Sequence, residues 1–210
     1  MEFLHEFINV FLHLDKSLQG VISQYGNLTY GILFAVIFAE TGLVVTPFLP
    51  GDSLLFAAGA LAPSTGLRPD LLFGLLTVAA VVGDAVNYAI GQALGDRAMN
   101  GHFMFIKKEH LDKTHAFYEK YGNKTIVLAR FVPIVRTFAP FVAGVGRMGY
   151  RQFALYNILG GILWVGLLIT AGYFFGEIPF VKKNFELVII GIIIVSILPG
   201  LFEWWRSRSK

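Results

Sequence analysis

The sequence predicts an all-α integral membrane protein with two oppositely oriented re-entrant helical hairpins, about three transmembrane helices and interfacial amphipathic helices. Of its 210 residues, 55% are hydrophobic and 15% are charged, and the mean hydropathy is +0.64. The runs 30–38 and 187–198 contain no charged residue at all. A chain of this length cannot bury so much apolar surface in a core of its own, so much of it is expected to face lipid.

The composition also limits the chemistry that the chain can perform. No cysteine is present, which excludes disulfides and Cys-ligated metals. The histidines lack the paired spacing of metal ligands, and neither a glycine-rich phosphate loop nor a nucleophile elbow occurs. We therefore expect no metal, no cofactor and no enzymatic activity. The cations that give the net charge of +3 lie between apolar runs rather than in one basic patch, so no nucleic-acid partner is expected.

The first third of the chain predicts an interfacial helix followed by a broken membrane segment. Apolar residues recur at helical spacing over 1–24 with polar residues between them, which is typical of an amphipathic helix at the membrane interface. The apolar segment 26–62 is interrupted by Pro47, Pro50 and Gly51, which are expected to break the helix. The arm after the break, residues 52–62, is too short to cross a bilayer. We therefore expect the segment to form a re-entrant hairpin that lines a cavity.

The remainder predicts a second broken segment set between three spans, and the whole chain, 1–210, is expected to form one membrane domain. The expected elements are a transmembrane helix at 70–95, a basic cytoplasmic amphipathic connector at 96–124, a second re-entrant hairpin at 125–146, transmembrane helices at 151–176 and 184–204, and a basic tail at 205–210. Pro133 and Pro140 are expected to break the second hairpin.

Short matches between the two halves predict an inverted repeat. Residues 25–29, Tyr-Gly-Asn-Leu-Thr, return at 121–125 as Tyr-Gly-Asn-Lys-Thr, and residues 56–59, Phe-Ala-Ala-Gly, return at 141–144 as Phe-Val-Ala-Gly. A hairpin plus one span crosses the bilayer an odd number of times, so the two copies would have opposite orientations. Each half closes with a Gly-x-x-x-Gly pair that can pack helices within one chain or between two, which leaves a homo-oligomer open.

The distribution of lysine and arginine predicts the orientation in the membrane. With both hairpins re-entrant, most of these cations fall on the side that carries 96–124 and the tail. The positive-inside rule makes that side cytoplasmic, so the C-terminus is expected in the cytoplasm. The side of the N-terminus stays open, because it changes if the first hairpin spans the membrane fully.

Charged residues inside the two broken segments are the candidate binding groups. Glu40 and Asp52 lie in the first segment, Arg130 and Arg136 in the second. Each charge left unpaired at the middle of a bilayer costs roughly 2.5–3.5 kcal/mol, so such groups are kept where they pair or function. The two arginines would face different sides of an unbroken helix, but a break at Pro133 lets both turn toward one cavity. A guanidinium fork matches phosphate oxygens. We therefore predict that the protein moves an anionic, phosphate-bearing molecule through the membrane and that both arginines bind this substrate.

The two acids are predicted to couple transport to protons. A carboxylate next to an arginine inside the membrane can exchange its proton or its arginine partner when a substrate arrives. The alternative is a static role, in which Glu40 and Asp52 pair with arginines only to hold the two hairpins together. Asp52 also follows Pro50 and Gly51, where it can cap the returning helix.

Asp84, Asn87 and Tyr88 form a polar group within the predicted span 70–95. Such a group can either contact a neighbouring helix or line a transport pathway. The sequence alone leaves these two interpretations open.

Three motifs give the chain a specific family resemblance. They are residues 40–53, Glu-Thr-Gly-Leu-Val-Val-Thr-Pro-Phe-Leu-Pro-Gly-Asp-Ser; residues 83–88, Gly-Asp-Ala-Val-Asn-Tyr; and residues 130–137, Arg-Phe-Val-Pro-Ile-Val-Arg-Thr, with Ala143 and Gly144 after them. Together they closely resemble the bacterial DedA family of inner-membrane proteins. That family is related to eukaryotic lipid scramblases of the VTT-domain type.

The resemblance implies lipid transport in the bacterial inner membrane. Members of the family are associated with recycling undecaprenyl phosphate, the lipid carrier of cell-wall precursors, or with flipping phospholipids. Glu40 and Asp52 match the family's acidic membrane-embedded residues, and Arg130 and Arg136 match its essential arginines. Dependence on the proton motive force is implied in the same way.

We therefore expect a flippase for an anionic, phosphate-bearing lipid, with undecaprenyl phosphate as the first candidate cargo and protons as the coupling ion. A flippase or scramblase for a phospholipid such as phosphatidylethanolamine is the close alternative. An ion/proton antiporter and a non-transporting membrane scaffold are further alternatives.

Overall fold

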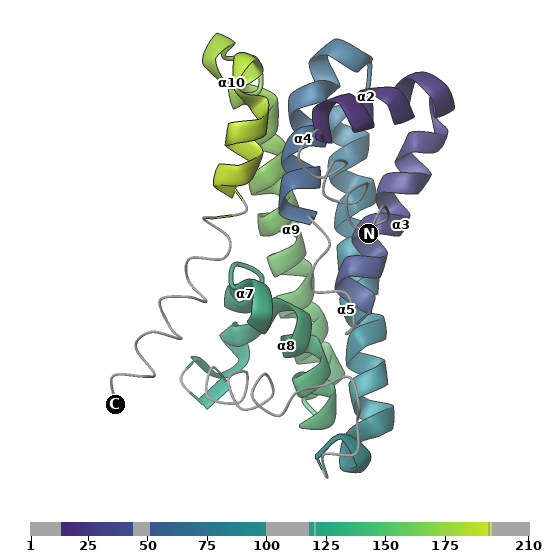
Figure 1. Ribbon diagram of the computed structural model, residues 1–210. Coiled ribbons are helices and arrows are strands. Elements are labelled where there is room, and N and C mark those ends of the chain that lie inside the picture. Colours follow the sequence, from purple (N-terminus) through teal and green to yellow (C-terminus); the bar gives the residue numbers. More distant parts are fainter. Residues whose placement is uncertain (1–13, 44–50, 100–117, 120, 193, 195–210) are drawn as a thin grey trace, which may run out of the picture.

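The computed structural model describes residues 14–43, 51–99, 118–119, 121–192 and 194, and its regular structure over these residues is helical throughout (Figure 1). In chain order the elements are α2 (Leu14–Tyr25), α3 (Leu28–Gly42), α4 (Gly51–Thr65), α5 (Pro69–Met99), the 3₁₀ turn η1 (Gly122–Lys124), α7 (Thr125–Ala129), α8 (Pro133–Val145), α9 (Tyr150–Phe175) and α10 (Pro179–Lys183). Residues 185–192 are also helical. The predicted all-α class is confirmed for this part of the chain.

Several sequence predictions lie outside the described residues. These are the start of the interfacial helix, the helix breaks at Pro47 and Pro50, most of the basic connector, and the end of the last predicted span with the tail.

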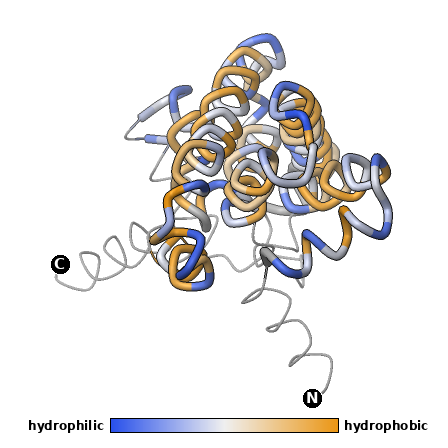
Figure 2. Tube along the Cα trace, turned by 90° about the horizontal axis from the view of Figure 1, so that it is seen from above, coloured by the Kyte–Doolittle hydropathy of each residue, from blue (hydrophilic) through white to orange (hydrophobic). Residues whose placement is uncertain are grey.

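Two long helices form the frame of the molecule (Figure 1). Within the described residues, Pro69–Leu94 of α5 and Tyr150–Phe175, which is α9, are each 26 residues long and apolar enough to cross a membrane. At 1.5 Å per residue each is about 39 Å long, which exceeds the roughly 30 Å hydrocarbon core. Only 44% and 33% of their most apolar stretches are buried. Figure 2 shows apolar residues around the outside of the helices as well as between them, as expected for surfaces in contact with lipid.

The other membrane helices are short and interrupted. α3 and α4 have 15 residues each and α8 has 13, so each is about 20–22 Å long and too short to cross the core alone. α7 ends at Ala129 and α8 begins at Pro133, where the missing N–H of a proline is not needed by the first turn. The re-entrant geometry of the two hairpins stays a prediction.

The expected break at Pro140 is wrong. Pro140 lies inside α8, which continues past it to Val145. A proline within a helix removes the one hydrogen bond to the carbonyl four residues earlier. Here the residues that follow, including Phe141 and Val142, are buried against the neighbouring helices and hold the helix together across this loss.

The short helix α4 packs closely on α9. A side chain added at Gly59 would collide with the carbonyl of Ile169, and one added at Gly172 would collide with the carbonyl of Phe56. The two backbones therefore touch, which is how small residues pack helices in membranes. α4 comes from the first half of the chain and α9 from the second.

The short helix α8 packs on α5 in the same manner. Gly144 lies against the carbonyl of Tyr88, and Gly91 lies against the carbonyl of Phe141. Each short helix thus rests on the long helix of the other half. These contacts involve the matched segments 56–59 and 141–144. Of the two Gly-x-x-x-Gly pairs, Gly91, Gly172 and Gly176 make contacts within the chain. The inverted repeat itself stays a prediction.

The remaining helices cover one end and one side of this frame. α2 lies across the end of α4, at a steep angle to the long helices (Figure 1), and buries Leu18 in the main core. α3 runs beside α5, where Gly42 meets the backbone of Gly83. The helix at 185–192 contributes Ile189 to the same core. These contacts fix the ends of α3, α4 and α8 close to one another.

Replacing Gly59 with alanine should destabilise the protein, because the added methyl group meets the backbone of α9 rather than a flexible side chain. We expect Gly59→Ala to lower the free energy of unfolding by about 1–3 kcal/mol, measured as a lower unfolding temperature of the purified protein in detergent. Gly74→Ala is the matched control, because nothing lies within 4 Å of its added methyl group. An equal loss in both variants would contradict the close approach of α4 and α9.

Candidate functional site

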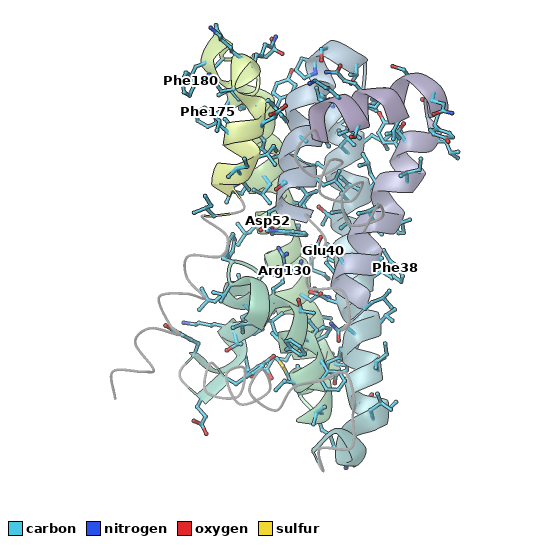
Figure 3. The ribbon with its side chains drawn as sticks, in the orientation of Figure 1. Phe38, Glu40, Asp52, Arg130, Phe175 and Phe180 are labelled. Atoms are coloured by element: carbon cyan, nitrogen blue, oxygen red, sulfur yellow. The ribbon has the colours of Figure 1, made fainter. Side chains whose placement is uncertain are left out.

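Arg136 binds two carboxylates where three helix ends meet. Its Nη1 donates to Oδ1 of Asp52 and its Nη2 donates to Oε1 of Glu40, both over 2.6 Å. The side chains of Glu40, Arg136 and Asp52 are 3%, 10% and 17% exposed. Figure 3 shows Glu40 and Asp52 pointing into the space between the helices, whereas Phe38, two residues before Glu40, points outward.

The helix ends explain why these three charges meet. Glu40 lies in the last turn of α3, Asp52 in the first turn of α4, and Arg136 in the first turn of α8. The positive end of the α4 dipole favours Asp52, while the same end of α8 disfavours Arg136. Two carboxylates on one guanidinium offset that unfavourable position.

Gly51 makes room for the carboxylate of Glu40. Any side chain at position 51 would overlap that carboxylate. The sequence predicts Gly51 only as part of a helix break, and the structure adds that its missing side chain lets the end of α3 approach the start of α4.

The Arg136 cluster carries an excess negative charge. With all three groups ionised, the two carboxylates and one guanidinium sum to a net charge of −1. The described part of the chain contains no group of three or more histidines and carboxylates that could hold a metal ion there. A proton on either carboxylate would bring the cluster to a net charge of zero.

Arg130 forms a second, fully buried cluster rather than joining the first. Its Nη2 donates to Oδ2 of Asp84 and to Oδ1 of Asn157, each over 2.5 Å. The side chains of Arg130 and Asp84 are 2% and 4% exposed. Asn157 is held in turn by donating its Nδ2 to the carbonyl of Val81 over 2.9 Å. The structure thus pairs Arg130 with Asp84, and only Arg136 with Glu40 and Asp52.

Three buried polar atoms of these clusters have no hydrogen-bond partner among the described residues. They are Nε and Nη1 of Arg130 and Oε2 of Glu40. Leaving one buried polar atom unpaired costs about 1–3 kcal/mol. The two Arg130 nitrogens can donate to oxygens of an occupant, and the Glu40 oxygen can accept a proton or another donor.

Trp164 of α9 joins the two clusters. Its Nε1 donates to Oδ1 of Asp52 over 2.8 Å. Its ring centre lies 5.0 Å from Cζ of Arg136 and 5.9 Å from Cζ of Arg130, within the range of a cation–π interaction. The sequence analysis missed Trp164 and Asn157, and the available signal was a tryptophan and an asparagine well inside an apolar span.

Asn87 and Tyr88 contact neighbouring helices. Asn87 donates its Nδ2 to the carbonyl of Thr41 at the end of α3 over 3.1 Å, and to that of Thr137 in α8 over 2.9 Å. Tyr88 donates to the carbonyl of Met148, and its ring stacks on another aromatic ring. The sequence leaves open whether these residues contact a neighbouring helix or line a transport pathway. For Asn87 and Tyr88, the observed contacts are those of helix packing.

Comparison with known proteins places this arrangement in a family. The profile of the VTT domain matches residues 49–174. "Protein DedA" of Escherichia coli K12 is 56% identical over 211 residues, which cover 99% of this chain and 96% of that protein. The chain belongs to the DedA family of VTT-domain proteins. The resemblance seen in the sequence motifs is therefore confirmed.

Other relatives are less similar to this chain. An uncharacterized membrane protein of Mycobacterium tuberculosis H37Rv is 43% identical over 187 residues, which cover 87% of this chain and 81% of that protein. "Inner membrane protein YqjA" of Escherichia coli K12 is 32% identical over 216 residues, covering 99% and 98% of the two chains. No solved structure matches this chain.

Breaking the Arg130–Asp84 pair should destabilise the protein more than removing both charges. Arg130→Gln leaves Asp84 buried without its cation, which costs about 3–5 kcal/mol for a buried ion pair. The double variant Arg130→Gln/Asp84→Asn leaves no unpaired charge and should regain most of that loss. Unfolding temperatures in detergent measure both effects, and a double variant as unstable as Arg130→Gln would argue against the pair.

Proposed function

We propose that this DedA-family protein moves a phosphate-bearing lipid, most directly undecaprenyl phosphate, across the bacterial inner membrane. The observation that carries the proposal is the Arg136 guanidinium, which is held between two carboxylates at a break between helices. A phosphate monoester presents oxygens to a guanidinium fork as a carboxylate does, so it can take the place of either acid on Arg136. The inner-membrane location follows that of relatives such as YqjA.

The net charge of the site supports coupling to protons. The Arg136 cluster is at −1 when ionised, and Arg130 with Asp84 adds nothing to this sum. An anionic headgroup is repelled by a site of negative charge, and the repulsion is strong at low dielectric. One proton on Asp52 or Glu40 brings the site to neutrality, and a second makes it positive. Lipid entry therefore favours proton uptake by the carboxylate that releases Arg136.

Arg130 is proposed to complete the phosphate site. Its Nε and Nη1 are buried and have no hydrogen-bond partner among the described residues. Both guanidinium groups lie within 6 Å of the same indole ring. A phosphate held by Arg136 can accept from Arg130 without breaking the bonds of Arg130 to Asp84 and Asn157. No covalent step is part of this proposal, and the lipid is expected to be recovered unchanged.

A phospholipid is the second candidate cargo, and the excess carboxylate favours it. The phosphate of phosphatidylethanolamine would bind Arg136, while its ammonium group would pair with the released acid. Such a zwitterion needs no net proton uptake, so the pH gradient separates the two cargoes.

Purified protein in vesicles should move labelled undecaprenyl phosphate between leaflets, and a pH gradient should increase the rate. We expect phosphatidylethanolamine to move at least about tenfold more slowly. Faster movement of phosphatidylethanolamine that does not depend on the pH gradient would instead support a phospholipid scramblase. Movement of neither lipid, with ion flux or with no transport at all, would overturn the proposal in favour of an antiporter or a scaffold.

Replacing Arg136 with lysine should abolish most transport although the charge is kept. An ammonium group donates from a single nitrogen and lacks the planar pair of nitrogens of a guanidinium, whereas Arg136 makes one bond through each terminal nitrogen. We expect the lipid movement rate to fall at least about a hundredfold. Arg68→Lys, at an exposed arginine that pairs only with Asp70 in the described structure, is the control and should transport normally. Transport by Arg136→Lys at the normal rate would contradict the fork geometry.

A triple variant tests a purely static role of the same cluster. Glu40→Gln/Asp52→Asn/Arg136→Gln removes all three charges and leaves none of them unpaired, so a scaffold should tolerate it. The transporter is expected to lose lipid movement while the protein still purifies as a folded monodisperse species. Normal lipid movement by this variant would show that the ion pairs only hold the helices together.

A further inference from the structure

The indole of Trp164 lies beside both charge clusters. Only 2% of its surface is exposed. Its N–H donates to Asp52, and its ring lies near the guanidinium groups of Arg136 and Arg130. Buried tryptophan commonly satisfies its N–H with any nearby acceptor. Here the acceptor is Asp52, an acidic residue of the proposed transport site.

One oxygen of Asp52 receives two donors. Its Oδ1 accepts from Nη1 of Arg136 over 2.6 Å and from Nε1 of Trp164 over 2.8 Å. When Arg136 turns to a lipid phosphate, this oxygen loses its cation. A buried carboxylate without partners is very unfavourable, whereas hydrogen bonds to charged groups are stronger than those between neutral groups. The indole N–H therefore stays as a donor to Asp52 during the exchange.

The packing keeps Trp164 and Asp52 together while Arg136 comes from elsewhere. Trp164 lies in α9 and Asp52 in α4, and these two helices touch through Gly59 and Gly172. Arg136 lies in α8, which rests on α5 instead. The bond between the indole and the carboxylate thus lies within one packed pair of helices, and the bond to Arg136 crosses between two pairs.

We propose that Trp164 is a positioning residue for lipid binding, which holds Asp52 in place while Arg136 exchanges that carboxylate for the phosphate of the lipid. This inference rests on the proposed function, because it assumes that Arg136 binds the phosphate. Trp164 acts through Asp52 and makes the release of Arg136 less costly. Its effect on binding should therefore depend on the charge of Asp52.

A double-mutant cycle on lipid affinity tests this dependence. The full-length protein in nanodiscs is titrated with undecaprenyl phosphate, and Kd is measured for wild type, Trp164→Phe, Asp52→Asn and the double variant. Phenylalanine keeps an aromatic face and removes the N–H. We expect Trp164→Phe to weaken binding about tenfold when Asp52 is present. In the Asp52→Asn background the same change should alter Kd less than about twofold, because release of Arg136 then leaves no charge behind.

Two controls separate positioning from packing. Phe153→Leu removes a fully buried aromatic ring that is stacked on Tyr88, away from Asp52, and should leave Kd unchanged. Trp204→Phe with Trp205→Phe makes Trp164 the single tryptophan of the chain. Its emission should then change and saturate with bound undecaprenyl phosphate, and this change should disappear in Arg136→Gln.

The outcomes distinguish the two proposals. Equal weakening by Trp164→Phe in both backgrounds, or Trp164 emission that stays constant while the lipid binds, would overturn the role of Trp164 and leave the transport site intact. Binding that Arg136→Gln does not weaken, or no binding by wild type, would overturn the phosphate site and the role of Trp164 together.

Discussion

Arg136 can bind Glu40 and Asp52 only because three helices end or begin at one place inside the molecule. α3 ends just after Glu40, α4 begins just before Asp52, and α8 begins three residues before Arg136. These helix ends place the three charges side by side, where they pair with one another inside the molecule. The interrupted helices and the buried charges therefore depend on each other, and the close approach at Gly51 is the detail that lets them meet.

The helical framework could be predicted from the sequence because lipid imposes a simple rule on it. Apolar runs long enough to cross a bilayer placed spans at 70–95 and 151–176, close to where α5 and α9 lie. The two prolines of the second broken segment were harder to distinguish. Pro133 begins α8 whereas Pro140 lies within it, and the difference depends on where the helix starts rather than on the proline itself.

The partners within the site could be predicted only in part. The sequence indicated that two acids and two arginines would meet inside the membrane, but not that Arg130 would take Asp84 while Arg136 took both other acids. That choice depends on which short helix packs on which long one, and this is decided by tertiary contacts between distant segments. Asn157 and Trp164 were missed because a single polar or aromatic residue in an apolar helix forms no pattern.

The crossed packing of the short helices divides the charges of the Arg136 cluster between packed helices from both halves of the chain. α4 rests on α9 and α8 rests on α5, so each pair contains parts of both halves. Asp52 and Trp164 lie in the first pair and Arg136 lies in the second, next to which α3 carries Glu40. Any separation of the two pairs would have to break the Arg136–Asp52 ion pair, whereas Arg136 and Glu40 lie on helices that both pack on α5.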